Sequence, residues 1–220
     1  MLEIRHITAA YHKDYPILSD INMDIGGGEK VVILGRNGAG KTTFAGSIFG
    51  LIPIISGEII LNGLDILSFS LEKLHSLGLG YFMQGAPVFS QMTVIENLRV
   101  SAGSIGGREF SSRSEEMRQL FPILNDGSFD QMPAGSLSGG ERTQLCIAMS
   151  IFRRPELLIL DEPFAGLSPA NATLILQILN AYQQDSGATI LLIAQDRKMA
   201  IEFSSEHYII REGKIIKENN

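Results

Sequence analysis

The chain has 220 residues, of which 45% are hydrophobic and 19% charged, and its formal net charge is −6 at pH 7. This length suits one α/β domain with a substantial core, and the composition is ordinary for a globular protein. The acidic balance, without a cluster of lysines and arginines, argues against a nucleic-acid binder that depends on phosphate contacts.

The sequence also carries no visible membrane or export signal. Its apolar runs are shorter than the ~20 residues that a spanning helix needs, and residues 1–5 do not begin a signal peptide. The single cysteine, Cys146, cannot form an intrachain disulfide, which indicates a reducing compartment. We therefore expect a cytoplasmic protein that reaches any membrane only through a partner.

The N-terminal third predicts an antiparallel layer that leads into a parallel core. β-favouring residues occupy 2–8, and residues 21–25 alternate apolar with polar side chains, the period of a half-buried strand. A buried strand is expected at 31–34, and a short strand at 57–63 lies between turn residues.

A glycine-rich turn, residues 35–43, separates the strand at 31–34 from a helix expected at 44–49. Strand, glycine-rich turn and Lys-Thr at a helix start form the context of a phosphate-binding loop. Lys41 would bind the β- and γ-phosphates, and the Thr42 hydroxyl would ligate Mg²⁺. A chance turn is the alternative, but both flanks favour a nucleoside triphosphate site. The residues assigned to the nucleotide are Gly35, Asn37, Gly38, Ala39, Gly40, Lys41, Thr42 and Thr43.

Strand signals fade after a strand expected at 79–83, which ends at Gln84. A helix at 93–101 has Thr93 as N-cap and Glu96 to complete a capping box. Gly106-Gly107 is interpreted as a break, and a helix is expected after it at 114–124. A turn-rich segment at 126–138 then leads to another helix, whose apolar face consists of Leu145, Ala148, Met149 and Phe152. We expect a single domain whose helical insertion spans about 85–153, between core segments of about 1–84 and 154–220.

Two carboxylates, Asp161 and Glu162, follow an apolar strand expected at 157–160. Ligands bind at the carboxyl ends of strands in open α/β sheets. Asp161 is suited to hold Mg²⁺, and Glu162 is suited to polarise an attacking water. The alternative is a solvated turn after a core strand, but the presence of a phosphate loop in the same chain favours a catalytic role.

The last third predicts a helix at 170–185, a strand at 189–194, a helix at 197–204 and a hairpin over 207–216. Alternation of strands and helices around buried strands predicts an α/β fold.

A second glycine pair occurs in Ser138-Gly139-Gly140-Glu141, at an expected helix start. A serine hydroxyl and free backbone N–H groups at a helix start form a potential anion site. Alone, this sequence is a common turn. Its place after the phosphate loop and before the acidic strand favours a functional role.

This order of motifs resembles the ATP-binding cassette (ABC) family over essentially the whole chain. Residues 35–43 match its phosphate loop, Gln84 its Q-loop, 137–141 its signature motif and 157–162 its acidic strand. The resemblance implies a P-loop NTPase fold that binds ATP and Mg²⁺ and hydrolyses ATP. It also implies a head-to-tail dimer with a second cassette, in which Ser138, Gly139 and Gly140 of one chain grip the ATP held by the other.

Further roles follow from the resemblance. Tyr11 stands where the family has an aromatic residue that stacks on adenine. Gln84 would contact the metal and the catalytic centre, and would link them to a transmembrane permease subunit that docks near residues 84–98. Val88 and Phe89, large apolar residues in this loop, either form that docking surface or pack on the insertion's own helices.

Two positions depart from the family pattern. Gln195 stands where a histidine usually contacts the γ-phosphate, and Ser168 replaces an aspartate. A glutamine amide donates a hydrogen bond but cannot take up a proton, so either the amide suffices or hydrolysis is weakened. The intact Lys41 and Glu162 favour the first interpretation. Both departures are similar to the cassettes of branched-chain amino acid importers.

We therefore expect the ATP-hydrolysing subunit of a membrane transporter, peripheral on the cytoplasmic face, with no nucleic acid as partner. Two alternatives remain open. One is a soluble cassette that acts on DNA or ribosomes, and the other is a nucleotide-responsive regulatory cassette with little turnover.

Overall fold

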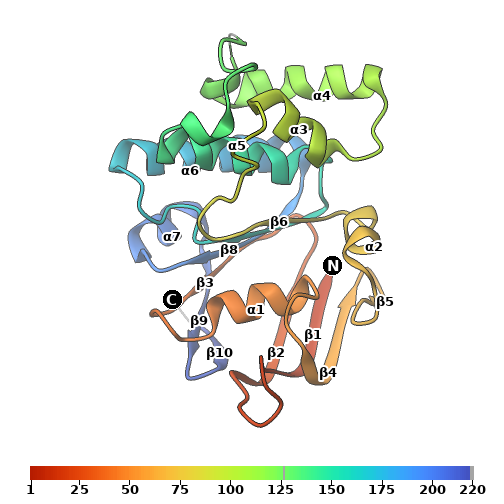
Figure 1. Ribbon diagram of the computed structural model, residues 1–220. Coiled ribbons are helices and arrows are strands. Elements are labelled where there is room, and N and C mark those ends of the chain that lie inside the picture. The colour runs from red at the N-terminus through yellow and green to blue at the C-terminus, as the bar shows by residue number, and fades with distance from the viewer. Residues whose placement is uncertain (126, 219–220) are drawn as a thin grey trace.

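A six-stranded sheet with the strand order β10-β9-β3-β8-β7-β6 lies at the centre of the fold (Figure 1). The computed structural model describes residues 1–125 and 127–218, so Asp126, the first residue of the predicted turn-rich segment, lies outside the described residues. The neighbours from β9 to β6 pair in parallel, and β10 pairs with β9 as the predicted antiparallel hairpin. The strands are β3 (Lys30–Leu34), β6 (Leu79–Phe82), β7 (Leu157–Asp161), β8 (Thr189–Ala194), β9 (Glu206–Arg211) and β10 (Lys214–Lys217).

The second sheet is antiparallel and comes from the N-terminal part of the chain, which confirms the predicted N-terminal layer. Its order is β2-β1-β4-β5, from β1 (Leu2–Ala9), β2 (Leu18–Ile25), β4 (Ile54–Leu61) and β5 (Leu64–Asp65). β4 begins three residues before the predicted strand at 57–63, because Gly57 lies inside it. Gly57 has φ 101°, and a Cβ there would lie 2.5 Å from the carbonyl oxygens of Arg5 and His6. Gly57 therefore allows β4 to approach β1 closely and does not mark the start of the strand.

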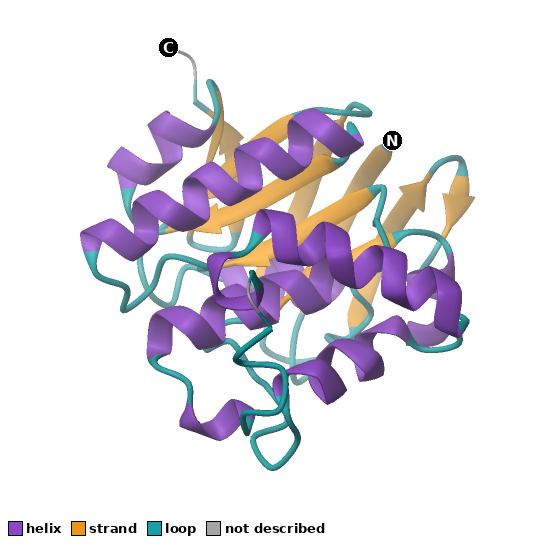
Figure 2. Ribbon diagram, turned by 90° about the horizontal axis from the view of Figure 1, so that it is seen from above, coloured by secondary structure: helices purple, strands orange, loops and turns teal. Residues whose placement is uncertain are grey.

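Helices cover the central sheet, and Figure 2 shows the longer ones lying across its strands. The helices are α1 (Lys41–Ile48), α2 (Leu71–Ser76), α3 (Val94–Ala102), α4 (Gly107–Leu120), α5 (Gly139–Ile151), α6 (Pro169–Ser186) and α7 (Arg197–Phe203). Short 3₁₀ helices lie at Pro122–Leu124 and Ala134–Ser136. Within the described residues, no helix combines the length and the apolar character that crossing a bilayer requires.

The prediction for α4 was wrong at both ends. Gly106 is its N-cap, with extended backbone, so the glycine pair begins this helix and does not separate it from the next. The helix stops at Leu120 because Phe121 takes an extended conformation before Pro122, as the residue before a proline prefers. α2 was not predicted, and its six residues are too short to show a helical period.

The central sheet separates two apolar cores. In β7, Leu158 and Leu160 pack with the layer of α3 to α6, whereas Leu157 and Ile159 pack with α1 and the antiparallel sheet. All five residues of β7 are buried. Burial on both faces explains why these strands are continuous apolar runs, and it leaves the strand ends as the places for polar side chains.

Candidate functional site

The glycine-rich loop joins β3 to the N-terminus of α1. Gly38 and Gly40 have φ values of 78° and 102°, which glycine adopts without strain. Gly35 lies against β9, where a Cβ would be 2.8 Å from the carbonyl oxygen of Ile210. Asn37 and Gly38 are exposed. The loop therefore curls at the start of an eight-residue helix, an arrangement suited to anions.

Three polar side chains from distant segments meet beside this loop. The Nζ atom of Lys41 lies 3.0 Å from Oε1 of Glu162, and Nε2 of Gln84 donates to Oε2 of Glu162 at 3.3 Å. Lys41 also donates to the carbonyl oxygen of Arg36 at 3.1 Å. The side chains of Lys41 and Glu162 are only 4% and 11% exposed, so little water screens their attraction.

The backbone holds Glu162 in an unusual conformation. Its φ is 53°, in the left-handed region that a non-glycine residue rarely adopts. Its N–H donates to the carbonyl oxygen of Ile193 in β8 at 2.9 Å. Such strain clusters at functional sites, where the surrounding structure fixes it. The strand sequence alone does not reveal this feature.

Asp161, the last residue of β7, is 0% exposed. Within the described residues, neither carboxylate oxygen has a partner in hydrogen-bond geometry. Burial raises the pKa of Asp161, and the nearby Thr42 hydroxyl and Lys41 charge act in the opposite direction. A buried carboxylate without a donor is costly. With the Thr42 hydroxyl it forms the oxygen donor set that a hard divalent cation prefers, so these residues fit Mg²⁺.

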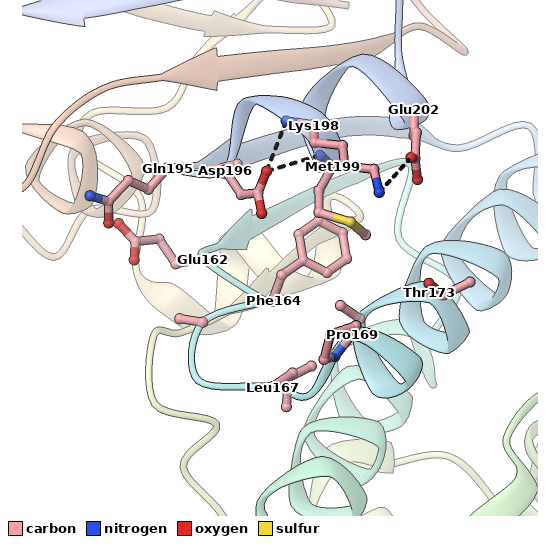
Figure 3. Close-up of a pocket in the computed structure, with 13 residues that line it drawn as sticks. Glu162, Phe164, Leu167, Pro169, Thr173, Gln195, Asp196, Lys198, Met199 and Glu202 are labelled. Atoms are coloured by element: carbon pink, nitrogen blue, oxygen red, sulfur yellow. Dashed lines mark hydrogen bonds and ion pairs between the residues drawn. The ribbon is translucent and has the colours of Figure 1, made fainter.

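Gln195 follows β8 and points toward Glu162 (Figure 3). It lines both the cavity of about 640 Å³ that contains Glu162 and the cleft of about 910 Å³ along the glycine-rich loop. The neighbouring Asp196 has a different role, because its carboxylate accepts from the backbone N–H groups of Lys198 and Met199 and caps α7. Gln195 therefore lines both hollows, whereas Asp196 lines only the one that contains Glu162.

The second glycine pair begins α5, away from the loop of its own chain. Ser138 caps the helix, accepting from the N–H of Glu141 at 3.4 Å and donating its own N–H to the Glu141 carboxylate at 2.7 Å. Sequence reasoning missed this capping box, although Ser-x-x-Glu signals one. Neither cavity that contains Gln195 is lined by residues 138–140. Ser138 and Gly139 are exposed to solvent, so this motif belongs to a separate surface.

Tyr11 lies just beyond β1 and is 55% exposed. Among the described residues it has no aromatic neighbour in ring contact. Its ring is therefore accessible to a ligand that enters from outside.

The segment after Gln84 forms one wall of an apolar groove. Val88 packs against the helical core, whereas Phe89 is 52% exposed and lines the groove with Met83 and Val100. Val88 therefore packs on the helical core, as the second alternative expected, whereas a docking role for the exposed Phe89 stays a prediction. The capping box of Thr93 and Glu96 at the start of α3 is confirmed.

Asn97, fully buried in α3, fixes the wall of this groove. Its Oδ1 accepts from the N–H of Phe89 at 2.8 Å, and its Nδ2 donates to the carbonyl oxygens of Phe89 and Thr93 at 3.1 and 2.9 Å. We expect Asn97→Ala to lower the free energy of unfolding by about 1–3 kcal/mol, since buried backbone groups lose their partners. Urea denaturation would measure the change. An unchanged midpoint would mean that the loop does not depend on Asn97.

Comparison with known proteins decides the family. The sequence matches the ABC transporter family over residues 18–165. The chain belongs to the ABC transporter family. Proteins of this ABC family bind and hydrolyse ATP, and the expected family and fold class are thereby confirmed.

Individual relatives cover nearly the whole of this ABC cassette. It is 37% identical over 215 residues to the probable branched-chain amino acid transport ATP-binding protein LivF of Archaeoglobus fulgidus, spanning 98% of this chain and 90% of that protein. It is 32% identical over 220 residues to the lipopolysaccharide export system ATP-binding protein LptB of Escherichia coli K12, spanning 98% and 88%. A dimeric post-hydrolysis structure of the ATP-binding cassette MJ0796, bound to ADP and Pi, has a TM-score of 0.86 at 22% identity and covers 100% of this chain and 98% of that one. That likeness shows the fold.

Proposed function

We propose that this chain is the ATP-hydrolysing subunit of an ABC transporter that drives solute movement through separate membrane subunits. The observation that carries the proposal is the meeting of Lys41, Glu162 and Gln84 beside the glycine-rich loop. A P-loop lysine, a carboxylate that follows one strand and an amide from the turn after another strand are groups suited to phosphoryl transfer to water.

Residues 35–43 hold the phosphates in this proposal, and Tyr11 stacks on adenine. Thr42, Asp161 and Gln84 would hold Mg²⁺, which neutralises phosphate charge when it is bound. The unpartnered oxygens of Asp161 support this assignment. The phosphates attract Lys41 away from Glu162, which leaves the Glu162 carboxylate free to accept a proton from the attacking water. Gln195 donates its amide N–H toward the phosphate and carries no charge at any physiological pH.

The proposed assembly is a dimer with a second ABC subunit, identical or related. Ser138 and Gly139 are exposed at the start of α5, with Gly140 buried beside them, and none of the three lines the two cavities that Gln195 lines. The N-terminus of a 13-residue helix attracts anions. In the dimer these residues would contact the nucleotide of the partner, so each ATP would lie between two chains.

A helical subdomain of about residues 85–153, between core segments of about 1–84 and 154–220, would receive the membrane subunit. The apolar groove beside residues 84–98 suits a short amphipathic helix. Its cationic lining group is Arg153, for which no ion pair is present among the described residues. Burial, and then the charge of Arg153, lower the pKa of His75, which also lines this groove. A permease helix with a carboxylate next to its apolar face would match this groove.

Reversing the charge at Arg153 tests the docking surface. We expect Arg153→Glu to weaken association with the copurifying membrane subunit by at least about tenfold, because opposed charges become like charges. Replacing the acidic residue of the membrane subunit by Lys should restore association with the Arg153→Glu variant. Arg108→Glu, on the exposed face of α4 outside the groove, is the matched control. Unchanged association of Arg153→Glu would place the contact elsewhere.

The direct test of the proposed function is Mg²⁺-dependent phosphate release from ATP by the purified chain, alone and with its membrane subunits. Stimulation by those subunits would support a transporter on the cytoplasmic face of the membrane. ATP binding without turnover, unchanged by membrane subunits, would favour the regulatory alternative. Purification free of any membrane protein would favour a soluble cassette. The similarity to LivF supports branched-chain amino acids as the solute class, which transport assays with these amino acids would test.

A further inference from the structure

The side chain of Asn171, in the first turn of α6, lies on the backbone of Gly140 in the first turn of α5. A Cβ built on Gly140 would meet the side-chain amide of Asn171, with the Cγ atom only 2.9 Å away. Gly140 is buried in this contact. Gly140 and Asn171 are 31 positions apart in the chain. Their contact therefore joins the second glycine pair, at the start of α5, to the start of α6.

Each helix is tied by a serine cap to the loop that precedes it. The hydroxyl of Ser138 accepts from the N–H of Glu141 at 3.4 Å, and the hydroxyl of Ser168 accepts from the N–H of Asn171 at 3.3 Å. The loop before Ser168 begins at Glu162, whose carbonyl oxygen accepts from the N–H of Ala165 at 3.1 Å. The backbone N–H of Asn171 is therefore bonded to Ser168 at the end of the loop that carries Glu162, and its side chain packs on Gly140.

We propose that Asn171 is a positioning residue that links the two nucleotide sites of the dimer. This inference rests on the proposed function, in which Gly140 contacts the partner's nucleotide while Glu162 acts on the nucleotide of its own chain. Because Asn171 fixes the start of α5 relative to the loop after Glu162, occupation of one site restricts the geometry of the other. A side chain at position 140 would displace this amide.

The link predicts a particular pattern of effects. Nucleotide binding to the separate chain depends on residues 35–43, and Asn171 does not touch them. ATP-driven dimerisation and cooperativity depend on the placement of Gly140. Residues in direct contact couple by enough to change an equilibrium about tenfold, so we expect Asn171→Ala to weaken ATP-dependent dimerisation by that factor, with an unchanged affinity of the monomer for ATP.

The experiment places Asn171→Ala in a Glu162→Gln background, in which ATP is not consumed, and measures the dimer dissociation constant in ATP by analytical ultracentrifugation. In the wild-type background, the Hill coefficient for ATP hydrolysis should fall toward one. Asn180→Ala is the matched control, because Asn180 lies on the same helix with similar exposure and instead accepts from Nζ of Lys30. Thermal unfolding checks that each variant is folded, and Asn171→Ser is a milder truncation if alanine is not tolerated.

Dimerisation of the Asn171 variants equal to that of Asn180→Ala would overturn the positioning role and leave the proposed function standing. If the Glu162→Gln parent itself does not dimerise with ATP and the wild type has no turnover, the proposed function and this inference fall together.

Discussion

Glu162→Gln is expected to reduce ATP hydrolysis by about 10²–10⁴-fold, the range that a general base contributes, while ATP still binds. The amide cannot accept the proton of the attacking water. It also removes the charge that pairs with Lys41 at 3.0 Å, which leaves the lysine free for phosphate. The variant should therefore accumulate as an ATP-bound dimer, which size-exclusion chromatography with and without ATP would detect beside a phosphate-release assay.

The control for this change lies at the opposite end of the same strand. Glu156 immediately precedes β7, where its carboxylate accepts from Asn62 at 3.0 Å. Glu156→Gln removes an equal charge, yet it should retain the wild-type rate. If Glu162→Gln kept more than about a tenth of the wild-type rate, its carboxylate would not be the general base.

Asp161→Asn is expected to have opposite effects on activity and on stability. Hydrolysis should fall at least about 100-fold, since even changes behind the metal ligands cost about 10–100-fold in metal affinity. Without Mg²⁺ and nucleotide, however, the variant should be more stable than wild type by about 1–3 kcal/mol, because a buried charge without a partner is replaced by a neutral amide. Denaturation in EDTA at pH 8 would measure this gain.

The pH dependence of that gain follows from the raised pKa of Asp161. Between the ordinary carboxyl pKa and this raised value, the folded chain binds a proton that the unfolded chain has released, so wild-type stability falls as pH rises. Below the ordinary pKa both states are protonated, and the two proteins should differ little. A difference that grew toward acidic pH would contradict burial as the cause.

Local sequence was enough for features that depend on a few neighbouring residues. The glycine-rich loop and Asp161-Glu162 are recognisable because a buried strand precedes each of them. The predicted start of α4 was wrong because Gly106-Gly107 is compatible with either a break or a helix N-terminus. Only the packing of Phe110 and Met117 on the helical core decides between these two possibilities.

The geometry between distant residues could not be derived from local patterns, although the resemblance to the family placed Gln84 at the catalytic centre. The pairing of Lys41 with Glu162, and the bond from Gln84, join the start of α1 to the loops that follow β7 and β6, and no local pattern shows that these segments converge. The left-handed conformation of Glu162 depends on its bond to Ile193 in the neighbouring strand. Asn97 illustrates the same point, because a lone asparagine in a helix looks like a surface residue until the loop that it holds is known.

The division of the core by the central sheet has a consequence for how such chains diverge. Substitutions on the α3–α6 side and on the α1 side share few direct neighbours, and distant substitutions usually change stability additively. Lineages can therefore reshape the helical side without compensating changes beneath the phosphate loop. This independence offers a physical basis for the similarity of one sequence to both an amino acid transport protein and a lipopolysaccharide export protein. It also predicts that chimaeras exchanging the helical side should fold.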